Sequence, residues 1–489
     1  MHDKKNMNQK HLLRAVVRIH AYGKPVDIAK PFLIQDRIKA VGTGFIVPTP
    51  EFAPPNFFYI LTCSHCVQIA DTITIILPLF GMTEHPACVV SLCPNFDLAL
   101  LALPAADLEL SHLQLGHSNN LSLGQKLTAV GYPLGQTALK ASDGVYAGFQ
   151  ERLQHTVSIS PGNSGGPLMN ENQEVIGINN SGVMQASNVG FAIPIEFYFL
   201  VQRALFTPPP HGNPSPERII HPLVFGFEFC PITKHHAKAI GASVCLPQPS
   251  NSGVLITTIL KQSAAASAGL QKGDILLKYD RFVIDNMGEV DVDWNYQKVR
   301  LQDVLNRVEP RPYPFLVWSE EKHCRTVEIT PAPYSTGAGK MIYPPYDAVD
   351  YLIFCGLVIT PLYMNYDTHP VIIETYACLT LDQLSESHVI VSHVFNGTVA
   401  QIEGSLLPGD RLSHINNLEV KTMQDVRHAL TQLVITSVQK KVFIFRTHTG
   451  KMFLLENSDA LAAEERAVSE NLYAPDPQIF QLLRTSSIH

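Results

Sequence analysis

The sequence is poor in charged residues and has no long apolar run. Only 16% of its 489 residues are charged, and 43 acidic side chains outnumber 36 basic ones, for a net charge of −7. The excess of Lys and Arg on which nucleic-acid and anionic-membrane binding rely is therefore missing. The apolar run at residues 72–80 contains Pro78 and is shorter than the roughly 18–20 residues of a bilayer span. We expect no nucleic-acid partner and no membrane span.

A signal peptide is also missing from the pattern. The charged residues 1–5 are followed by polar residues rather than by an apolar block, so no Sec-type signal is predicted. Hydrophobic residues make up 46% of the chain, which is enough to bury real cores. We therefore predict a soluble multidomain protein with a cytoplasmic location. Export into a host cell by a route that is independent of a signal peptide is the alternative.

Cysteine and histidine patterns give no sign of a disulfide framework or a metal centre. The nine cysteines are an odd number and are spread along the chain, so we expect reduced, structural thiols. Cys63 and Cys66 form a Cys-x-x-Cys, but a zinc site needs a second pair or regularly spaced histidines. The adjacent His235 and His236 have no further ligands nearby and fit a solvated loop. No cofactor and no metal are predicted.

Two changes of composition divide the chain. Residues 207–216 are rich in Pro, and residues 331–339 are rich in turn formers and nearly uncharged. The predicted organisation is a first domain, a linker, a first repeat module, a second linker, a second repeat module and a tail, at residues 1–206, 207–222, 223–334, 335–350, 351–458 and 459–489.

The first block reads as short strands separated by turns, which indicates an all-β barrel or sandwich. A helix is expected at residues 196–205. The apolar or β-branched runs that we expect to form strands are residues 41–47, 57–62, 72–77, 98–103 and 127–131.

The two later blocks resemble each other. Each has a β-branched strand followed by a Gly-Asp turn that opens another strand, with Gly273-Asp274 in one and Gly409-Asp410 in the other. We interpret this as one module used twice.

Three segments of the first block together predict a catalytic triad. A serine hydroxyl becomes a good nucleophile only when a base removes its proton and a carboxylate orients that base. The chain offers His65 after a strand, Asp97 before a strand, and Ser164 inside Gly-Asn-Ser-Gly-Gly. This His, Asp, Ser order is that of chymotrypsin-like double barrels. Each residue alone is weak evidence, because such residues are common in turns, but all three in this order predict a serine hydrolase.

The residues around the predicted nucleophile also suit an oxyanion hole. The glycines on both sides of Asn163 and Ser164 allow a sharp turn, so that the N–H groups of Gly162 and Ser164 can converge on one oxygen. Each such donor typically contributes on the order of 3 kcal/mol to stabilisation of the transition state. We predict that Gly162, Asn163 and Ser164 form this loop.

The chain resembles the HtrA/Deg serine proteases over nearly its whole length. The resemblance is carried by residues 42–47, 61–67, 97–101, 162–167, 176–179 and 190–194. Each later block resembles a PDZ domain, and residues 354–362 are most similar to the plant nuclear Deg branch, which has no signal peptide, and its bacterial relatives. The resemblance implies an endopeptidase that assembles as trimers or hexamers, in a mainly β fold of a double barrel followed by two PDZ domains.

The chain departs from this family in three places. Residues 148–159 are too short for the usual sensor loop, which leaves the usual activation relay in doubt. No Cys in residues 42–47 can pair with Cys66, as expected of a cytosolic enzyme. The family's primary pocket corresponds here to Ile159, Gly182 and Val183, which offer no acidic residue for Lys or Arg. We therefore expect cleavage after small or medium aliphatic residues.

The two PDZ-like blocks suggest peptide-binding loops. A PDZ domain binds an extended C-terminus by adding it as a strand, with the carboxylate held by loop N–H groups. Phe225, Gly226 and Phe227 fit this loop in the first block, and Cys355, Gly356 and Leu357 fit it less typically in the second. The second block could instead serve assembly.

Two functions remain open from the sequence. The first is an ATP-independent serine endopeptidase that acts on unfolded or specific polypeptides, with C-terminal peptides bound at the first PDZ-like block. The second is a peptide-binding chaperone or PDZ scaffold with a latent triad. Replacement of Ser164 separates them, because only the enzyme would lose its function.

Overall fold

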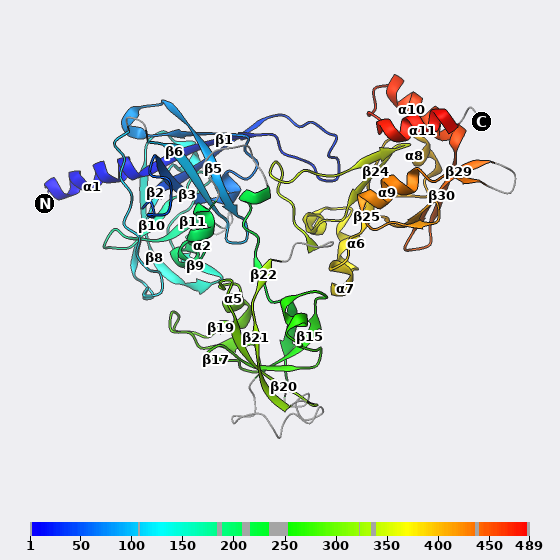
Figure 1. Ribbon diagram of the computed structural model, residues 1–489. Coiled ribbons are helices and arrows are strands. Elements are labelled where there is room, and N and C mark those ends of the chain that lie inside the picture. The colour runs from blue at the N-terminus through cyan, green and yellow to red at the C-terminus, as the bar shows by residue number, and fades with distance from the viewer. Residues whose placement is uncertain are drawn as a thin grey trace. The chain divides into compact units, whose positions relative to one another are not determined.

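A computed structural model describes most of the chain, in two compact units (Figure 1). The predicted pocket residue Val183 and the pair His235-His236 lie outside the described residues. One unit comprises Met1–Pro25 and Asp36–Tyr334, and the other comprises Val26–Gln35 and Ser335–His489. The described residues are 2–105, 108–182, 188–207, 216–233, 253–321, 323–333, 339–435 and 440–486.

The first unit begins with helix α1 (His2–Ala15) and a closed six-stranded barrel. Its core is made by fully buried apolar side chains, such as Ile19, Phe45 and Leu61, and consecutive residues are buried along much of β1, β2, β3 and β6. The strands, in barrel order, are β1 (Val16–Gly23), β2 (Ile38–Val47), β3 (Phe57–Cys63), β6 (Leu98–Pro104), β5 (Glu84–Cys93) and β4 (Thr72–Ile76).

A second closed barrel follows, and helix α2 (Ile195–Phe206) comes directly after it. The strands and the helix expected from the sequence in this region are all present, and the mainly β, double-barrel prediction is confirmed. The strands, in barrel order, are β10 (Pro167–Met169), β11 (Val175–Gly182), β12 (Gly190–Pro194), β9 (Arg152–His155), β8 (Lys140–Gln150) and β7 (Lys126–Gly131).

The rest of the first unit is a module built on a six-stranded antiparallel sheet, in which β14 is an edge strand. Its helices are α4 (Ala264–Ser267) and α5 (Leu301–Leu305). The strands are β13 (Leu223–Val224), β14 (Phe227–Pro231), β15 (Val254–Ile259), β16 (Ile275–Tyr279), β17 (Phe282–Val283), β18 (Glu289–Val290), β19 (Val299–Arg300), β20 (Tyr313–Ser319), β21 (His323–Ile329) and β22 (Ala332–Pro333).

The second unit contains a similar module with an eight-stranded sheet. The strands are β23 (Leu352–Phe354), β24 (Leu357–Pro361), β25 (Val389–Val394), β26 (Arg411–Ile415), β27 (Leu418–Glu419), β28 (Val434–Ile435), β29 (Lys441–Thr447) and β30 (Met452–Glu456). The helices are α6 (Ile373–Ala377), α7 (Leu381–Leu384), α8 (Val399–Glu403), α9 (Met423–Leu430), α10 (Asn457–Ser469) and α11 (Pro477–Ser486).

The repeat of the two modules can be followed in individual hydrogen bonds. Ile256 N–H donates to Asp274 O at 2.9 Å in the first, and Val391 N–H donates to Asp410 O at 2.9 Å in the second. The Gly-Asp turn therefore opens the next strand in the same way in both modules. We call residues 223–333 the first module and residues 351–456 the second module.

The segment Val26–Gln35 belongs to the second unit, although it connects β1 and β2 of the first barrel. Tyr366 Oη donates to Ile28 O at 2.9 Å, and Ser392 Oγ donates to Ala29 O at 2.9 Å. The ring of Phe32 lies 4.6 Å from that of Phe395, between centroids. Its sequence gave no indication of this packing.

The residues after β30 also pack against the second module. Ala460 of α10 and Ile479 and Leu483 of α11 are buried in the same core as the strands. The predicted tail thus has a buried face. Within the described residues, no helix is both long enough and apolar enough to cross a bilayer.

Candidate active site

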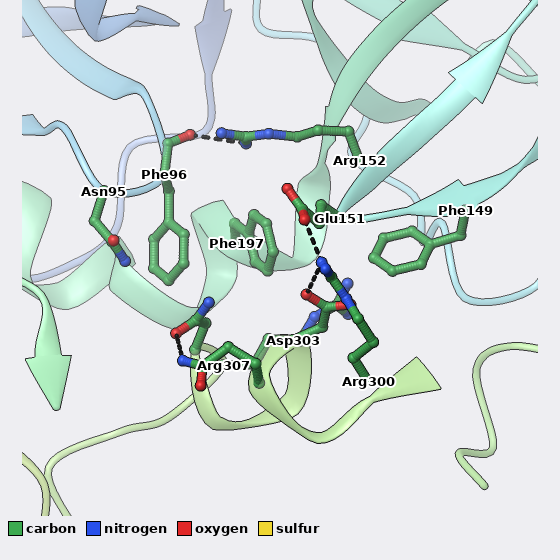
Figure 2. A pocket seen from close by; sticks show the side chains of 11 residues that line it. Asn95, Phe96, Phe149, Glu151, Arg152, Phe197, Arg300, Asp303 and Arg307 are labelled. Carbon is green, nitrogen blue, oxygen red and sulfur yellow. Dashed lines mark hydrogen bonds and ion pairs between the residues drawn. The ribbon is translucent and has the colours of Figure 1, made fainter. Parts of the chain in front are cut away.

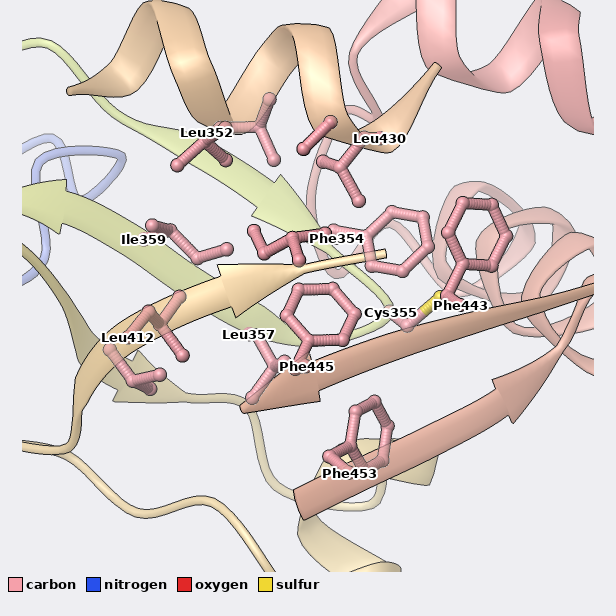
Figure 3. Close-up of a cluster of buried hydrophobic side chains, with 14 of the residues drawn as sticks. Leu352, Phe354, Cys355, Leu357, Ile359, Leu412, Leu430, Phe443, Phe445 and Phe453 are labelled. Carbon is pink, nitrogen blue, oxygen red and sulfur yellow. The ribbon is translucent and has the colours of Figure 1, made fainter. Parts of the chain in front are cut away.

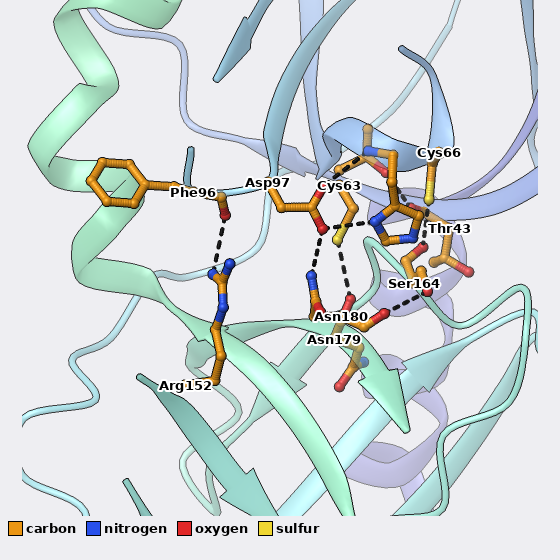
Figure 4. A network of polar contacts seen from close by, with 11 residues as sticks. Thr43, Cys63, Cys66, Phe96, Asp97, Arg152, Ser164, Asn179 and Asn180 are labelled. Carbon is orange, nitrogen blue, oxygen red and sulfur yellow. Dashed lines mark hydrogen bonds and ion pairs between the residues drawn. The ribbon is translucent and has the colours of Figure 1, made fainter. Parts of the chain in front are cut away.

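His65 and Asp97 are held against each other at the open end of the first barrel. His65 lies in the 3-10 turn η1 (Ser64–Cys66) after β3, and Asp97 directly precedes β6. His65 Nδ1–H donates to Asp97 Oδ2 at 2.7 Å, and the main-chain N–H of His65 donates to Asp97 Oδ1 at 2.9 Å (Figure 4). The carboxylate thus fixes both the ring and the backbone of the histidine, as an orienting group does.

The electrostatics of the pair favour a protonated imidazole at rest. Burial alone lowers the pKa of His65, but the hydrogen bond to Asp97 and the neighbouring Cys66 raise it above its usual 6.5. The Asp97 side chain is 17% exposed, whereas that of His65 is 44% exposed. A histidine that keeps its proton cannot act as a general base until it loses that proton.

The hydroxyl of Ser164 has another partner. Ser164 Oγ donates to the main-chain oxygen of Asn180 at 2.7 Å. Within the described residues, no hydrogen bond joins Ser164 to His65. The structure therefore brings the three predicted residues to one place but links only two of them.

Asn180, in β11, connects Ser164 to Asp97, and no sequence pattern pointed to this contact. Its side-chain amide donates to Asp97 Oδ2, the oxygen that also accepts from His65 (Figure 4). Its carbonyl oxygen accepts from Ser164. Because asparagine is common in turns and strand ends, only the three-dimensional arrangement identifies this role.

The turn around Ser164 has a glycine with positive φ on each side. Gly162 has φ 98° and Gly165 has φ 85°, conformations that favour glycine. A Cβ on Gly165 would come within 2.2 Å of the Thr43 carbonyl oxygen. Thr43 Oγ1 donates to Gly162 O at 2.6 Å and fixes the turn. Among the described residues, no acceptor binds the N–H groups of Gly162 and Ser164, as an oxyanion hole requires.

The remaining predicted residues of this barrel are placed only in part. Asn163 is buried and its N–H closes the turn onto Ser160 O at 3.0 Å. Ile159 packs against the core of the second barrel, and Gly182 ends β11, paired with Gly190. No acidic side chain is among these residues.

The predicted peptide-binding loops begin the two modules. In the first, Phe225 is buried, Gly226 has φ 87°, and Phe227 opens β14. In the second, Cys355, Gly356 and Leu357 join β23 to β24, and Cys355 and Leu357 are fully buried.

A cavity of about 280 Å³ lies close to the triad, between the β8–β9 hairpin, α2 and α5 (Figure 2). Phe96, which precedes Asp97, lines it, and Arg152 Nη1 donates to the Phe96 carbonyl at 3.1 Å. The guanidinium carbon of Arg307 lies 3.9 Å from the ring centroid of Trp294 and 4.8 Å from that of Phe197. Cation–π contacts therefore join the first module to α2 beside Asp97.

Among the described residues, three metal-capable side chains meet only at Cys63, His65 and Asp97. The His65 and Asp97 atoms concerned already bond each other, so the group is explained by the triad.

Comparisons with known proteins find a trypsin-like peptidase domain in the first unit. Residues 42–178 match the family described as trypsin-like peptidase domain. A Chlamydia pneumoniae protein named "Probable periplasmic serine endoprotease DegP-like" is 30% identical over 282 residues, 54% of this chain and 51% of that protein. The Synechocystis sp. serine protease HhoB is 31% identical over 256 residues, 50% of this chain and 57% of that protein. This chain thus spans about half the length of the curated relatives it matches.

A solved structure entitled "HtrA-type protease AlgWS227A with decapeptide" is 20% identical to this chain, with a TM-score of 0.49. The match covers 70% of this chain and 99% of the chain in that structure.

The names of the relatives correct one prediction. The Chlamydia pneumoniae protein and relatives from Marinomonas sp. and Pseudomonas fulva are all named periplasmic serine endoproteases. The cytoplasmic location predicted from the sequence is therefore wrong, and the relatives point to a periplasmic or exported protein. The prediction failed because it relied on the missing apolar block at the N-terminus and on reduced thiols, and neither of these reports a compartment directly.

Proposed function

We propose that this chain, which is HtrA/DegP-like by its trypsin-like peptidase domain, is an ATP-independent serine endopeptidase that degrades or processes unfolded or specific polypeptides. The observation that carries the proposal is the His65–Asp97 hydrogen bond with Ser164 placed on the preorganised turn beside it. His65, Asp97 and Ser164 come from three separate segments between the strands of the two barrels, which supports the proposal.

In the proposed mechanism His65 is the general base and Asp97 orients it. His65 takes the proton of Ser164 Oγ as that oxygen attacks the peptide carbonyl, and it then returns the proton to the leaving amine. The N–H groups of Gly162 and Ser164 would hold the oxyanion. Water then hydrolyses the acyl-enzyme by the same steps. To enter this cycle, Ser164 must leave the Asn180 carbonyl and His65 must lose its proton.

The pocket proposal rests on composition. Ile159 and Gly182 carry no charge, and Val183 lies outside the described residues. A pocket without a carboxylate cannot pair a substrate Lys or Arg, so cleavage after Val, Ala, Ile or Thr is proposed.

The proposed partners are polypeptide substrates, C-terminal peptides at the first module, and further copies of this chain in a trimer or hexamer. The support for the peptide is the free edge of β14, because β14 pairs only with β15 among the described strands. Phe225, Gly226 and Phe227 lie at the start of this edge.

A second function, a peptide-binding chaperone or scaffold with a latent triad, is favoured by two observations. Ser164 donates to Asn180 rather than to His65, and the pKa of His65 is raised. Both features keep the nucleophile inactive at rest.

The deciding experiment is degradation of unfolded β-casein without ATP, with mass spectrometry of the product termini. Wild type and Ser164→Ala are compared, with Ser158→Ala, an exposed serine in the same loop, as the matched control. Turnover by wild type and Ser158→Ala alone, with aliphatic residues at the cuts, supports the endopeptidase. Equal turnover by Ser164→Ala contradicts it, and dominant cutting after Lys or Arg contradicts the pocket. If none turns over, the latent scaffold is favoured.

A further inference from the structure

The peptide-binding edge of the second module is already filled. Strand β23 pairs antiparallel with β24, with Leu352 opposite Ile359 and Phe354 opposite Leu357. An external C-terminal peptide would have to add to this same edge, in this same direction. The strand that precedes the loop therefore stands where such a peptide would lie.

The loop between the two strands has closed into a tight turn. Cys355 has φ 51° and Gly356 has φ 91°, and the flanking residues Phe354 and Leu357 face each other in the ladder. Two consecutive residues with positive φ fit a two-residue hairpin turn. A Cβ on Gly356 would come within 2.2 Å of Thr398 Oγ1, so the turn is packed on its outer side as well.

A carboxyl group of this chain binds the loop where a ligand carboxylate would be held. The N–H of Cys355 donates to Glu464 Oε1 at 2.6 Å. Glu464 lies on α10 and is 1% exposed, so that this oxygen cannot be exchanged for a solvent anion. A short hydrogen bond from a buried N–H to a carboxylate is the contact by which a PDZ loop holds a C-terminus.

The last side chain of β23 is also buried as the end of a ligand would be. Phe354 is fully buried, and its ring centroid lies 4.8 Å from that of Phe443 (Figure 3). The same core contains Ala460 of α10, which adjoins Cys355 Sγ through its carbonyl at 3.8 Å.

The first module differs in its strand pairing and in its loop conformation. Its strand before the loop, β13, pairs with β22 and not with β14. Phe225 does not have the positive φ of Cys355, although Gly226 keeps that of Gly356. The bond from Leu260 N–H to Gly226 O, at 2.9 Å, matches that from Phe395 N–H to Gly356 O, at 2.9 Å, so the two loops are otherwise equivalent.

We propose that the second module is self-occupied, with β23 in place of an added peptide strand and the Glu464 side chain in place of its terminal carboxylate. Its partner is therefore the C-terminal helix pair of this chain, and it does not take external C-termini. This deepens the proposed function and rests on the PDZ-like interpretation of both modules. Peptide recognition is left to the first module.

The test is hydrogen exchange of the full chain, read by mass spectrometry, in the Ser164→Ala background to prevent self-cleavage. The probe is a mixture of synthetic decapeptides with free C-terminal carboxylates and aliphatic last residues, and the amidated mixture is the control. We expect residues 352–361 to exchange slowly without peptide and to change less than about twofold with it. Slower exchange of β24 with peptide, or faster exchange of β23, overturns the proposal.

The variants make the test independent of the first module. Glu464→Ala removes the acceptor and should speed exchange at Cys355 and Leu357 about tenfold, because a buried N–H loses its partner. Glu464→Gln keeps an acceptor oxygen and should change less, and Glu465→Ala, on the exposed side of α10, should change nothing. If Glu464→Ala unfolds the module, exchange at Cys355 and Leu357 is compared between Glu464→Gln and the chain without a substitution at Glu464. Fast exchange at these two residues in the chain that keeps Glu464 refutes the proposal. If peptide does not slow β14 either, peptide binding by the first module fails separately.

Discussion

Ser164 and Asn180 are joined by a hydrogen bond in the candidate active site. The Ser164 hydroxyl donates to the Asn180 carbonyl oxygen at 2.7 Å, while the side chain of the same asparagine donates to Asp97. One residue of β11 therefore binds both Ser164, the predicted nucleophile, and Asp97, the predicted orienting carboxylate. A polypeptide that lies along β11 and donates its own N–H to that carbonyl would free the hydroxyl for His65.

Asn180→Ala should slow the proteolytic step while leaving substrate binding nearly intact. The variant removes a hydrogen bond to a charged carboxylate, typically worth about 1.5–3 kcal/mol, so a kcat loss of about 10- to 100-fold is expected. Because Asp97 then interacts more strongly with protonated His65, the pKa of His65 should rise and the rate should climb at higher pH. Steady-state kinetics between pH 6 and 9 measure both effects.

Asn170→Ala is the matched control for that variant, since Asn170 bonds Glu174 in a turn of the same barrel away from the triad. It should change stability but not the pH dependence of kcat. An unchanged kcat and pH profile in Asn180→Ala would show that Asn180 does not position the triad.

The contacts of Arg307 should stabilise the packing of the first module on the protease-like barrels more than the neighbouring Arg300–Glu151 ion pair does. Its guanidinium faces Trp294, Phe197 and Phe149, and burial lowers its pKa to about 10. Arg307→Ala removes these contacts and enlarges the cavity, which should destabilise the first unit by about 2 kcal/mol.

Arg300→Ala is the control for Arg307→Ala. Arg300 pairs with Glu151 across the same cavity and with Asp303 three residues along the chain. Arg300 itself is more than half exposed and packs against no aromatic ring among the described contacts, so its loss should cost less than that of Arg307, about 1 kcal/mol. Urea unfolding followed by tryptophan fluorescence measures both. Equal losses would mean that the aromatic contacts of Arg307 are unimportant.

His155 should make the first unit sensitive to acid. It is fully buried in the second barrel, and burial lowers its pKa from 6.5 to about 4. Below pH 6.5 the unfolded chain takes up a proton that the folded chain does not bind until about pH 4. The contribution of His155 is therefore complete above pH 6.5 and is lost as the pH falls toward 4, by up to about 3 kcal/mol.

His155→Leu should remove that component of the pH dependence, whereas His117→Leu, at an exposed position, should not. Melting temperatures at pH 5 and 7.5 test this. The prediction is refuted if the melting temperature falls between pH 7.5 and pH 5 by no more in the wild type than in His155→Leu.

The sequence predicts the parts of the molecule that depend on local pattern. Strands such as β3 and β6 are short apolar runs with turns at both ends, and His65 and Asp97 lie beside them. Contacts between distant segments leave no such pattern. The bond from Cys355 to Glu464 joins residues 109 positions apart, and the burial of Ala29 depends on a sheet more than 300 residues away. The local sequence at Cys355 therefore predicts a peptide-binding loop, and only the structure shows its contact with Glu464.

Glu464 should give the second unit the opposite pH dependence from that of the first. Burial raises its pKa from 4.5 to about 7, and the Cys355 N–H and Tyr473 only partly oppose this. The folded chain then keeps a proton that the unfolded chain loses above pH 4.5. Stability is therefore full below pH 4.5 and declines as the pH rises to about 7, by up to about 3 kcal/mol.

Glu464→Gln cannot ionise, so the difference in unfolding free energy between wild type and this variant should shift in favour of the variant between pH 5 and pH 8. Hydrogen exchange of α10 measures it within the second unit, where the acid sensitivity of His155 does not contribute. A difference that stays constant with pH would mean that the Glu464 carboxylate is already ionised when it binds the Cys355 N–H. The Cys355 N–H would then bind a charged Glu464 carboxylate throughout this pH range, and raising the pH would not destabilise α10 and α11.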